Sequence, residues 1–186
     1  MNQRTSISTL LLFLVAVFIA GAARDVAAQS TDKRKPITLK PPSGYMPADF
    51  PEERVGKLLL NAKRPGGMFI VYPKAGEGPE VLPDLLKTMV VGMFFHDDKA
   101  QVSWTTTTLP AHKGIDNESG TLYAASNEQM EIQLAVYDRT LGGTRILYGY
   151  YGMRHKGKKE KDDAPFMDAS GNGVDDFDKF WRSIHE

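Results

Sequence analysis

The stretch from residue 119 to residue 155 restricts the fold most. Apolar and polar residues alternate in it, and a glycine pair then predicts a turn that reverses the direction of the chain. Every second residue from Met130 to Val136 is apolar, and polar or small residues stand between them. A period of two predicts a strand with one buried face. Gly142 and Gly143 follow, and because both central positions of the favoured two-residue turn need a positive φ, they predict a β-hairpin. The return segment TRILYGYYGM is apolar on both faces, which predicts a central strand.

Further elements follow from the same criteria. Strands are expected at 68–73 (MFIVYP), 101–109 (QVSWTTTTL) and 121–126 (TLYAAS). Helices are expected at 51–67, at 82–95 and in the last dozen residues. The order helix, strand, helix, four strands, helix predicts an α+β fold, in which an antiparallel sheet of about five strands packs with three helices.

The first of these helices is predicted by residues 51–67, PEERVGKLLLNAKRPGG. Pro51 suits the first helical position, Val55 and Leu58 recur at helix spacing, and Gly66 marks the end of the segment. The last helix is predicted by four apolar residues at i, i+3, i+4 and i+7, namely Phe177, Phe180, Trp181 and Ile184.

The chain is expected to divide into three parts. Residues 1–28 have an early cation, an apolar stretch and small residues before Gln29, as in a signal peptide that is cleaved after Ala28. Residues 29–50 are rich in Lys and Pro and predict a flexible arm. Residues 51–186 are expected to form a single domain, which would be secreted or periplasmic and would have no membrane span after cleavage.

Composition restricts the partners of this expected mature chain. Without residues 1–28 the chain has 21 basic and 22 acidic residues, a near-neutral balance that gives no general attraction to nucleic acid. The chain has no cysteine, so the fold is expected to need no disulfide. Asn117, in Asn-Glu-Ser, is an acceptor pattern for a glycan that only a eukaryotic secretory route would attach.

A possible metal site lies at DASGNGVDDFDK, residues 168–179, which partly follows a twelve-residue calcium loop. The candidate ligands are Asp168, Ser170, Asn172 and Asp176. The last position, which normally supplies a bidentate carboxylate, is Lys179. The residues are explained as well by a turn, with Asn172 as a cap, before an acidic helix start, and this second interpretation is favoured.

Catalytic signals are sparse. His96, Asp97 and Asp98 could form an acid/base or metal-binding corner, with His112 as a further member, and a small hydrolase is one alternative function. No nucleophile elbow, phosphate-binding loop or dinucleotide fingerprint is present. No catalytic residue is assigned and no cofactor is expected.

Aromatic residues on strands offer a second alternative, a small-ligand site. Trp104 stands beside a threonine ladder, and Tyr148, Tyr150 and Tyr151 lie on the central strand. These four residues are the candidate ligand contacts. The threonine segment is equally typical of an outer, solvent-facing strand, which is the favoured interpretation.

An aliphatic strand that ends in Tyr-Pro, a helix, a run of antiparallel strands and a closing aromatic helix (FDKFWRSI) follow one another in this chain. In element order the chain resembles the PsbP/Mog1-like α/β/α sandwich domains over most of residues 51–186. The resemblance implies an accessory protein and transfers no catalytic residue. The expected function is therefore an exported, non-enzymatic domain that binds a protein or an envelope component.

Overall fold

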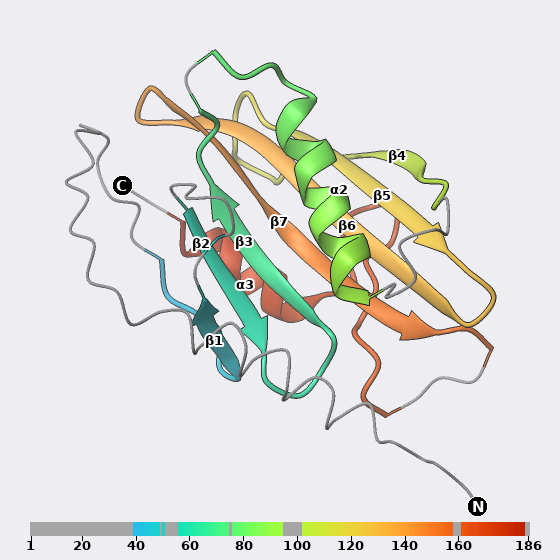
Figure 1. The fold of residues 1–186 in the computed structure, drawn as a ribbon. Helices are drawn as coiled ribbons and strands as arrows, with labels where there is room; N and C mark the ends of the chain where they lie inside the picture. The colour runs from blue at the N-terminus through green and yellow to red at the C-terminus, as the bar shows by residue number, and fades with distance from the viewer. Residues whose placement is uncertain are drawn as a thin grey trace, which may run out of the picture. The chain divides into compact units, whose positions relative to one another are not determined.

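The computed structural model describes residues 39–48, 50, 56–74, 76–94, 102–157 and 161–184, all of which belong to one compact unit, 35–186. The predicted leader, residues 1–28, lies outside the described residues. The described elements are β1 (Tyr45–Ala48), β2 (Gly56–Asn61), β3 (Gly66–Val71), α2 (Val81–Phe94), β4 (Thr105–Leu109), β5 (Ser119–Ser126), β6 (Met130–Leu141), β7 (Thr144–His155) and α3 (Asp175–Arg182) (Figure 1).

All seven strands form one antiparallel sheet in the order β1-β2-β3-β7-β6-β5-β4. β6 and β7 make the long central hairpin, in which Leu141 pairs with Thr144 around the two glycines. Gly142 and Gly143 have φ values of 55° and 76°, as the favoured two-residue turn requires. Because β7 lies between β3 and β6, the prediction of a central return strand is confirmed.

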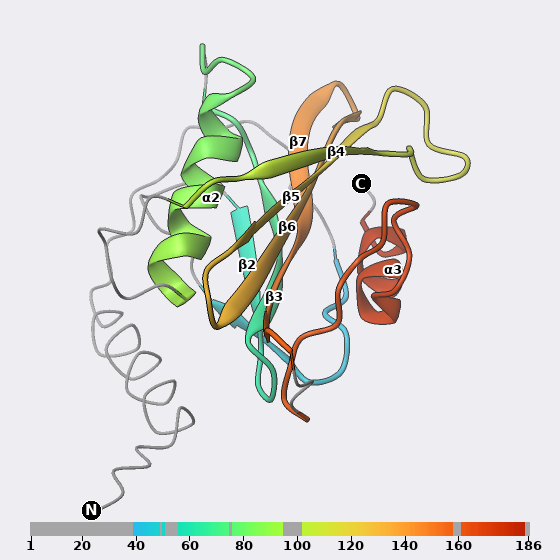
Figure 2. The ribbon, with the colours of Figure 1, turned by 90° about the vertical axis from the view of Figure 1, so that its right-hand side faces the viewer.

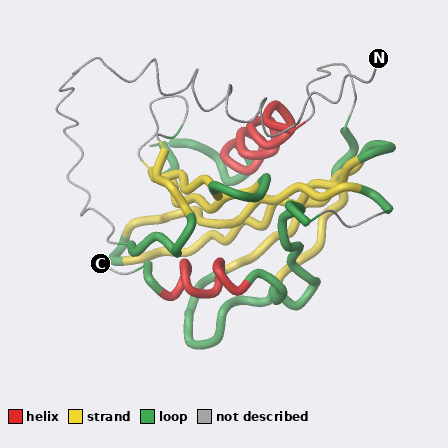
Figure 3. The backbone as a smooth tube through the Cα atoms, turned by 90° about the horizontal axis from the view of Figure 1, so that it is seen from below, coloured by secondary structure: helices red, strands yellow, loops and turns green. Residues whose placement is uncertain are grey.

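Helices α2 and α3 lie on opposite faces of the sheet and pack in two separate cores (Figures 2 and 3). On one face, Leu82, Leu86 and Val90 of α2 pack on the even-numbered residues of β6 that the alternation predicted to be buried together. On the other face, the stripe of α3 packs on Tyr137, Tyr148 and Tyr150, among others. The aromatic stripe predicted from Phe177 to Ile184 is confirmed, since all four of its members are buried.

The predicted fold class, an α+β fold with about five strands and three helices, is wrong, because the described residues form a mostly β fold. The structure has seven strands and, among the described residues, two helices, instead of about five strands and three helices. The predicted helix at 51–67 is replaced by β2, and residues 51–55 lie outside the described residues. Leu58 and Leu59 fit helix spacing, but in β2 they face opposite cores and are 4% and 1% exposed. A short apolar run is compatible with either a helix or a strand. Here the segment forms a strand because it pairs with β3.

Part of the predicted arm also belongs to the sheet. β1 lies within residues 29–50 and pairs with β2, so Tyr45 and Ala48 pack partly against the cores. The helix predicted at 82–95 is confirmed as α2. No helix in the described ranges has the length and apolarity that a membrane crossing requires.

Candidate functional site

A buried polar cluster, formed by His112, Glu118 and Tyr148, lies on the α3 face of the sheet. Glu118 ends the loop between β4 and β5, and its side chain is fully shielded from solvent. One carboxylate oxygen accepts hydrogen bonds from the backbone N–H of His112 at 2.6 Å and from its Nδ1 at 2.8 Å. The other accepts the hydroxyl of Tyr148. An ionised carboxylate only accepts, so both neighbouring groups direct their protons to Glu118.

The electrostatics of this polar cluster favour an ionised Glu118. Burial raises the pKa of Glu118, but the hydrogen bonds from His112 and Tyr148 outweigh it and hold the pKa below its ordinary value. Burial and the bond to Glu118 raise the pKa of Tyr148 well above its ordinary value. Tyr148 is therefore a poor nucleophile, because its proton is held by the carboxylate.

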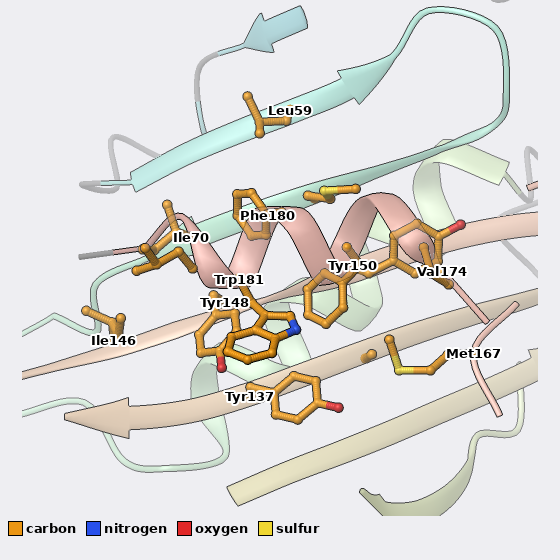
Figure 4. Packing of buried hydrophobic residues seen from close by; sticks show 14 of the residues in the cluster. Leu59, Ile70, Tyr137, Ile146, Tyr148, Tyr150, Met167, Val174, Phe180 and Trp181 are labelled. Carbon is orange, nitrogen blue, oxygen red and sulfur yellow. The ribbon is translucent and has the colours of Figure 1, made fainter. Parts of the chain in front are cut away.

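Aromatic rings enclose the polar cluster. The His112 ring stacks on Trp181 of α3 with 4.1 Å between centroids and lies 4.3 Å from Tyr137 of β6. Figure 4 shows Trp181 and Phe180 of α3 among the tyrosines of β6 and β7. Burial raises the pKa of Tyr137 to about 12. The histidine is thus held on two sides by rings and on a third by Glu118.

A buried arginine extends these polar contacts to the end of α3. Arg139 of β6 is 6% exposed, and its Nη2 donates to the carbonyl of Ile184 at 3.0 Å. Its guanidinium carbon lies 5.2 Å from the centre of the Tyr148 ring. Its Nε has no hydrogen-bond partner. The chain of contacts from Glu118 through Tyr148 to Arg139 therefore joins the β4–β5 loop, the sheet and the last helix.

The geometry of the polar cluster supports a structural role better than a catalytic one. Its hydrogen bonds are made among its own members, and its exposure is limited to 11% of the His112 side chain. Its effect is to attach the loop 110–118 to the sheet. Sequence reasoning missed Glu118, because an acidic residue in a polar loop has no pattern that marks it as buried. It named His112 only as a possible partner of His96.

The strand that this loop anchors forms an open edge of the sheet. β4 pairs with β5 on one side, and no strand among the described residues pairs with its other side. Thr105 to Thr108 are exposed, whereas Leu109 is 2% exposed and packs in the α3 core. The favoured interpretation of the threonine segment, an outer solvent-facing strand, is confirmed.

The four residues predicted to contact a ligand are placed apart. Tyr148 and Tyr150 lie under α3, Tyr151 lies in the α2 core, and all three are at most 1% exposed. Trp104 is half-buried just before β4, and its ring meets Tyr123 edge-on, with 6.4 Å between ring centroids. The structure does not bring the tyrosines and Trp104 together on one open face, and ligand binding by them stays a prediction.

The loop that resembles a calcium site is closed by its own backbone. Oδ1 of Asp168 accepts the N–H groups of Ser170 at 2.8 Å and Asn172 at 3.0 Å. Asp176 pairs with Lys179 at 3.3 Å. Asn172 does not cap α3, because the N-cap position is Val174 and no side chain caps it. Within the described ranges, no group of three or more His, Asp or Glu side chains is placed to hold a metal ion.

The remaining catalytic candidates are His96, Asp97 and Asp98. All three lie outside the described residues. At the end of β7, His155 bonds to the buried Asp163 at 2.7 Å, and Arg154 pairs with Glu131 of β6 at 2.7 Å. The bond between His155 and Asp163 attaches the segment 161–167 to the sheet, and the pair of Arg154 and Glu131 joins β7 to β6.

Comparison of the chain with protein-family models, with curated proteins and with solved structures finds no match. The fold and the geometry of the sites therefore carry the functional argument alone. The likeness to PsbP/Mog1-like domains stays a prediction.

Proposed function

We propose that this chain is an exported, non-enzymatic domain that binds another protein of its compartment or of the cell envelope. Export rests on the signal-peptide pattern of residues 1–28. The observation that carries the binding role is the outer edge of β4, which no strand of the described residues covers, and which is exposed, uncharged and held in place by a buried polar cluster.

An edge of this kind is uncommon in a protein that works alone, because unpaired backbone groups attract other strands. Natural edges are usually blunted by proline, by charge or by a bulge. The opposite edge, β1, contains Pro47, which has no N–H to offer. β4, with the sequence TTTTL, has none of these devices. The contrast between the two edges favours β4 as the binding surface.

Rigid placement of the edge supports the same role. Binding costs less free energy when the surface is ordered beforehand. Leu109 ends β4 inside the α3 core, and the loop that follows is attached through Glu118. The bound and free forms of β4 are therefore expected to be alike.

A selection experiment paired with a substrate panel tests this function. The full chain is used to select from a displayed library of random peptides, and in parallel it is incubated with ester, peptide and phosphate substrates. We expect enriched peptides with dissociation constants in the range of about 1–100 μM and no turnover. Turnover that disappears in His96→Asn, with an unchanged unfolding midpoint, would instead support the hydrolase.

A further inference from the structure

We infer that the partner contributes a short, uncharged, extended segment that adds an eighth strand beside β4 and places an apolar side chain on Trp104. This inference rests on the proposed function and names the partner of the same edge. Strand addition takes its affinity from backbone hydrogen bonds and its specificity from alternate side chains. Here the backbone of β4 would supply the hydrogen bonds, and the side chains of β4 and Trp104 would supply the specificity.

The length of the edge selects a peptide segment over a second copy of this chain. β4 has five residues, which at about 3.4 Å per residue give an edge of about 17 Å. Pro110 follows at once and has no N–H, so the ladder ends there. A stable interface between two copies needs at least about 1,000 Å² of buried surface. Two five-residue edges paired with each other bury much less, whereas a short segment needs only this ladder.

The side chains of β4 define the chemistry of the added strand. Thr106 and Thr108 project on the α2 face with Trp104, and Thr105 and Thr107 project on the α3 face with Leu109. β-Branched residues pair well across strands. β4 has no charged residue that could pair with a charge on the added strand. A segment of Val, Ile, Thr and Ser therefore fits, whereas acidic or basic residues at its centre would remain unpaired.

Trp104 gives the edge a large apolar contact. It precedes β4, is half-buried, and packs against the α2 core beside Tyr123. Next to it, Lys87 lies 5.0 Å over the Tyr123 ring and is paired with Asp84. Tyr123 belongs to β5, the inner neighbour of β4, so a Leu, Ile or Phe of a strand added outside β4 would meet Trp104 from the opposite side.

The first test uses synthetic peptides, so that the fold of the domain is not altered. The probes are acetylated, amidated heptapeptides of Val, Thr and Ser with a single Leu, and the same peptides with Glu at two central positions. We expect the uncharged peptides to bind, to change the fluorescence of Trp104, and to bind roughly tenfold or more tightly than the Glu versions.

Backbone N-methylation of the peptides identifies the binding mode. Successive N–H groups of a strand point to opposite sides, so every second N–H of the peptide faces β4. Methylation of that set of residues removes hydrogen bonds to β4, and methylation of the residues between them does not. We expect a loss of roughly fivefold or more for one of the two sets only. Equal binding after methylation of either set would overturn strand addition.

Two proline variants make the matching test on the protein. Thr106→Pro and Thr107→Pro remove neighbouring N–H groups, one directed to β5 and one directed outward. We expect one variant to lose stability and the other to keep the wild-type unfolding midpoint and lose peptide binding. If the folded variant binds the selected peptides as the wild type does, the binding role stands and the edge is the wrong surface. If neither the synthetic nor the displayed peptides bind, the proposed function falls as well.

Discussion

At the scale of single residues, Glu118 shows how one buried carboxylate can organise a loop. It accepts the backbone and side chain of His112 and the hydroxyl of Tyr148, and it is shielded from solvent. A buried acceptor that loses its donors is costly, and so is a donor that loses its acceptor. The carboxylate and its donors are therefore expected to act as one unit.

Replacement of Glu118 tests this unit. Glu118→Gln removes the charge and should lower the free energy of unfolding at pH 7 by about 1.5–3 kcal/mol. Because the folded pKa lies below its ordinary value, the stabilisation by Glu118 is complete above the unfolded pKa of about 4.3 and is lost as pH falls through the folded pKa. The difference between wild type and variant should therefore shrink in acid.

Urea unfolding between pH 3 and pH 7 measures this difference. The exposed Asp116, two residues earlier in the same loop, gives the matched control Asp116→Asn. We expect the control to stay within about 0.5 kcal/mol of wild type. A gap between Glu118→Gln and wild type that does not change with pH would contradict the assigned charge.

Asp168 separates the turn interpretation from the metal interpretation. Its Oδ1 accepts two backbone N–H groups, so Asp168→Ala should cost about 1 kcal/mol, whereas Asp168→Asn keeps an acceptor and should stay close to wild type. Addition of calcium should leave the unfolding midpoint of all three proteins unchanged. A calcium-dependent rise in wild type that Asp168→Asn abolishes would restore the loop as a metal site.

At the scale of elements, α3 shows how a helix of eight residues is stabilised by docking. Isolated helices of this length do not persist in water, so tertiary packing must supply the stability. Phe177, Phe180 and Trp181 pack on the sheet, and acidic residues occupy the first turn. Before the helix, Gln133 bonds to both the N–H and the carbonyl of Met167 and so holds the incoming chain.

Truncation of the docking face tests this dependence. Trp181→Ala should lower the free energy of unfolding by about 3–5 kcal/mol, because a buried aromatic ring is replaced by a cavity beside His112. Lys179→Ala, on the exposed side of the same helix, should change it by less than about 0.5 kcal/mol. Denaturant unfolding followed by circular dichroism compares the two. Similar losses in both would show that helix propensity, not docking, dominates.

At the scale of the whole molecule, one sheet separates two cores, and its centre is packed most tightly. A Cβ atom on Gly149 of β7 would lie 1.9 Å from the carbonyl oxygen of Ala135 and 2.6 Å from Phe69. β3, β7 and β6 approach one another here because this residue has no side chain. Glycine is therefore needed at position 149 because the neighbouring strands approach closely, and not because of its backbone conformation, since its φ is not in the left-handed region.

A pair of glycine substitutions tests this packing. Gly149→Ala should destabilise the protein by about 3 kcal/mol, since backbone has to move. Gly92→Ala, in α2 where a Cβ would meet no atom within 4 Å, should stabilise it by about 0.5–1 kcal/mol through helix propensity. Thermal unfolding of the two variants measures the opposite signs. A stable Gly149→Ala would contradict the central register of β7.

Local patterns by themselves determined the hairpin around Gly142 and Gly143, the faces of β6, the helix α2 and the buried stripe of α3. These features depend on periodicity and turn chemistry, which act between near neighbours. Tertiary structure alone decided that residues 56–61 form a strand, that β1 joins the sheet, and that Tyr148 lies beneath a helix. It also brought Glu118 to Tyr148 and placed β4 at the edge of the sheet, where no strand of the described residues pairs with its outer side. These outcomes depend on contacts between segments that are distant in the sequence. A local sequence pattern carries no information about such contacts.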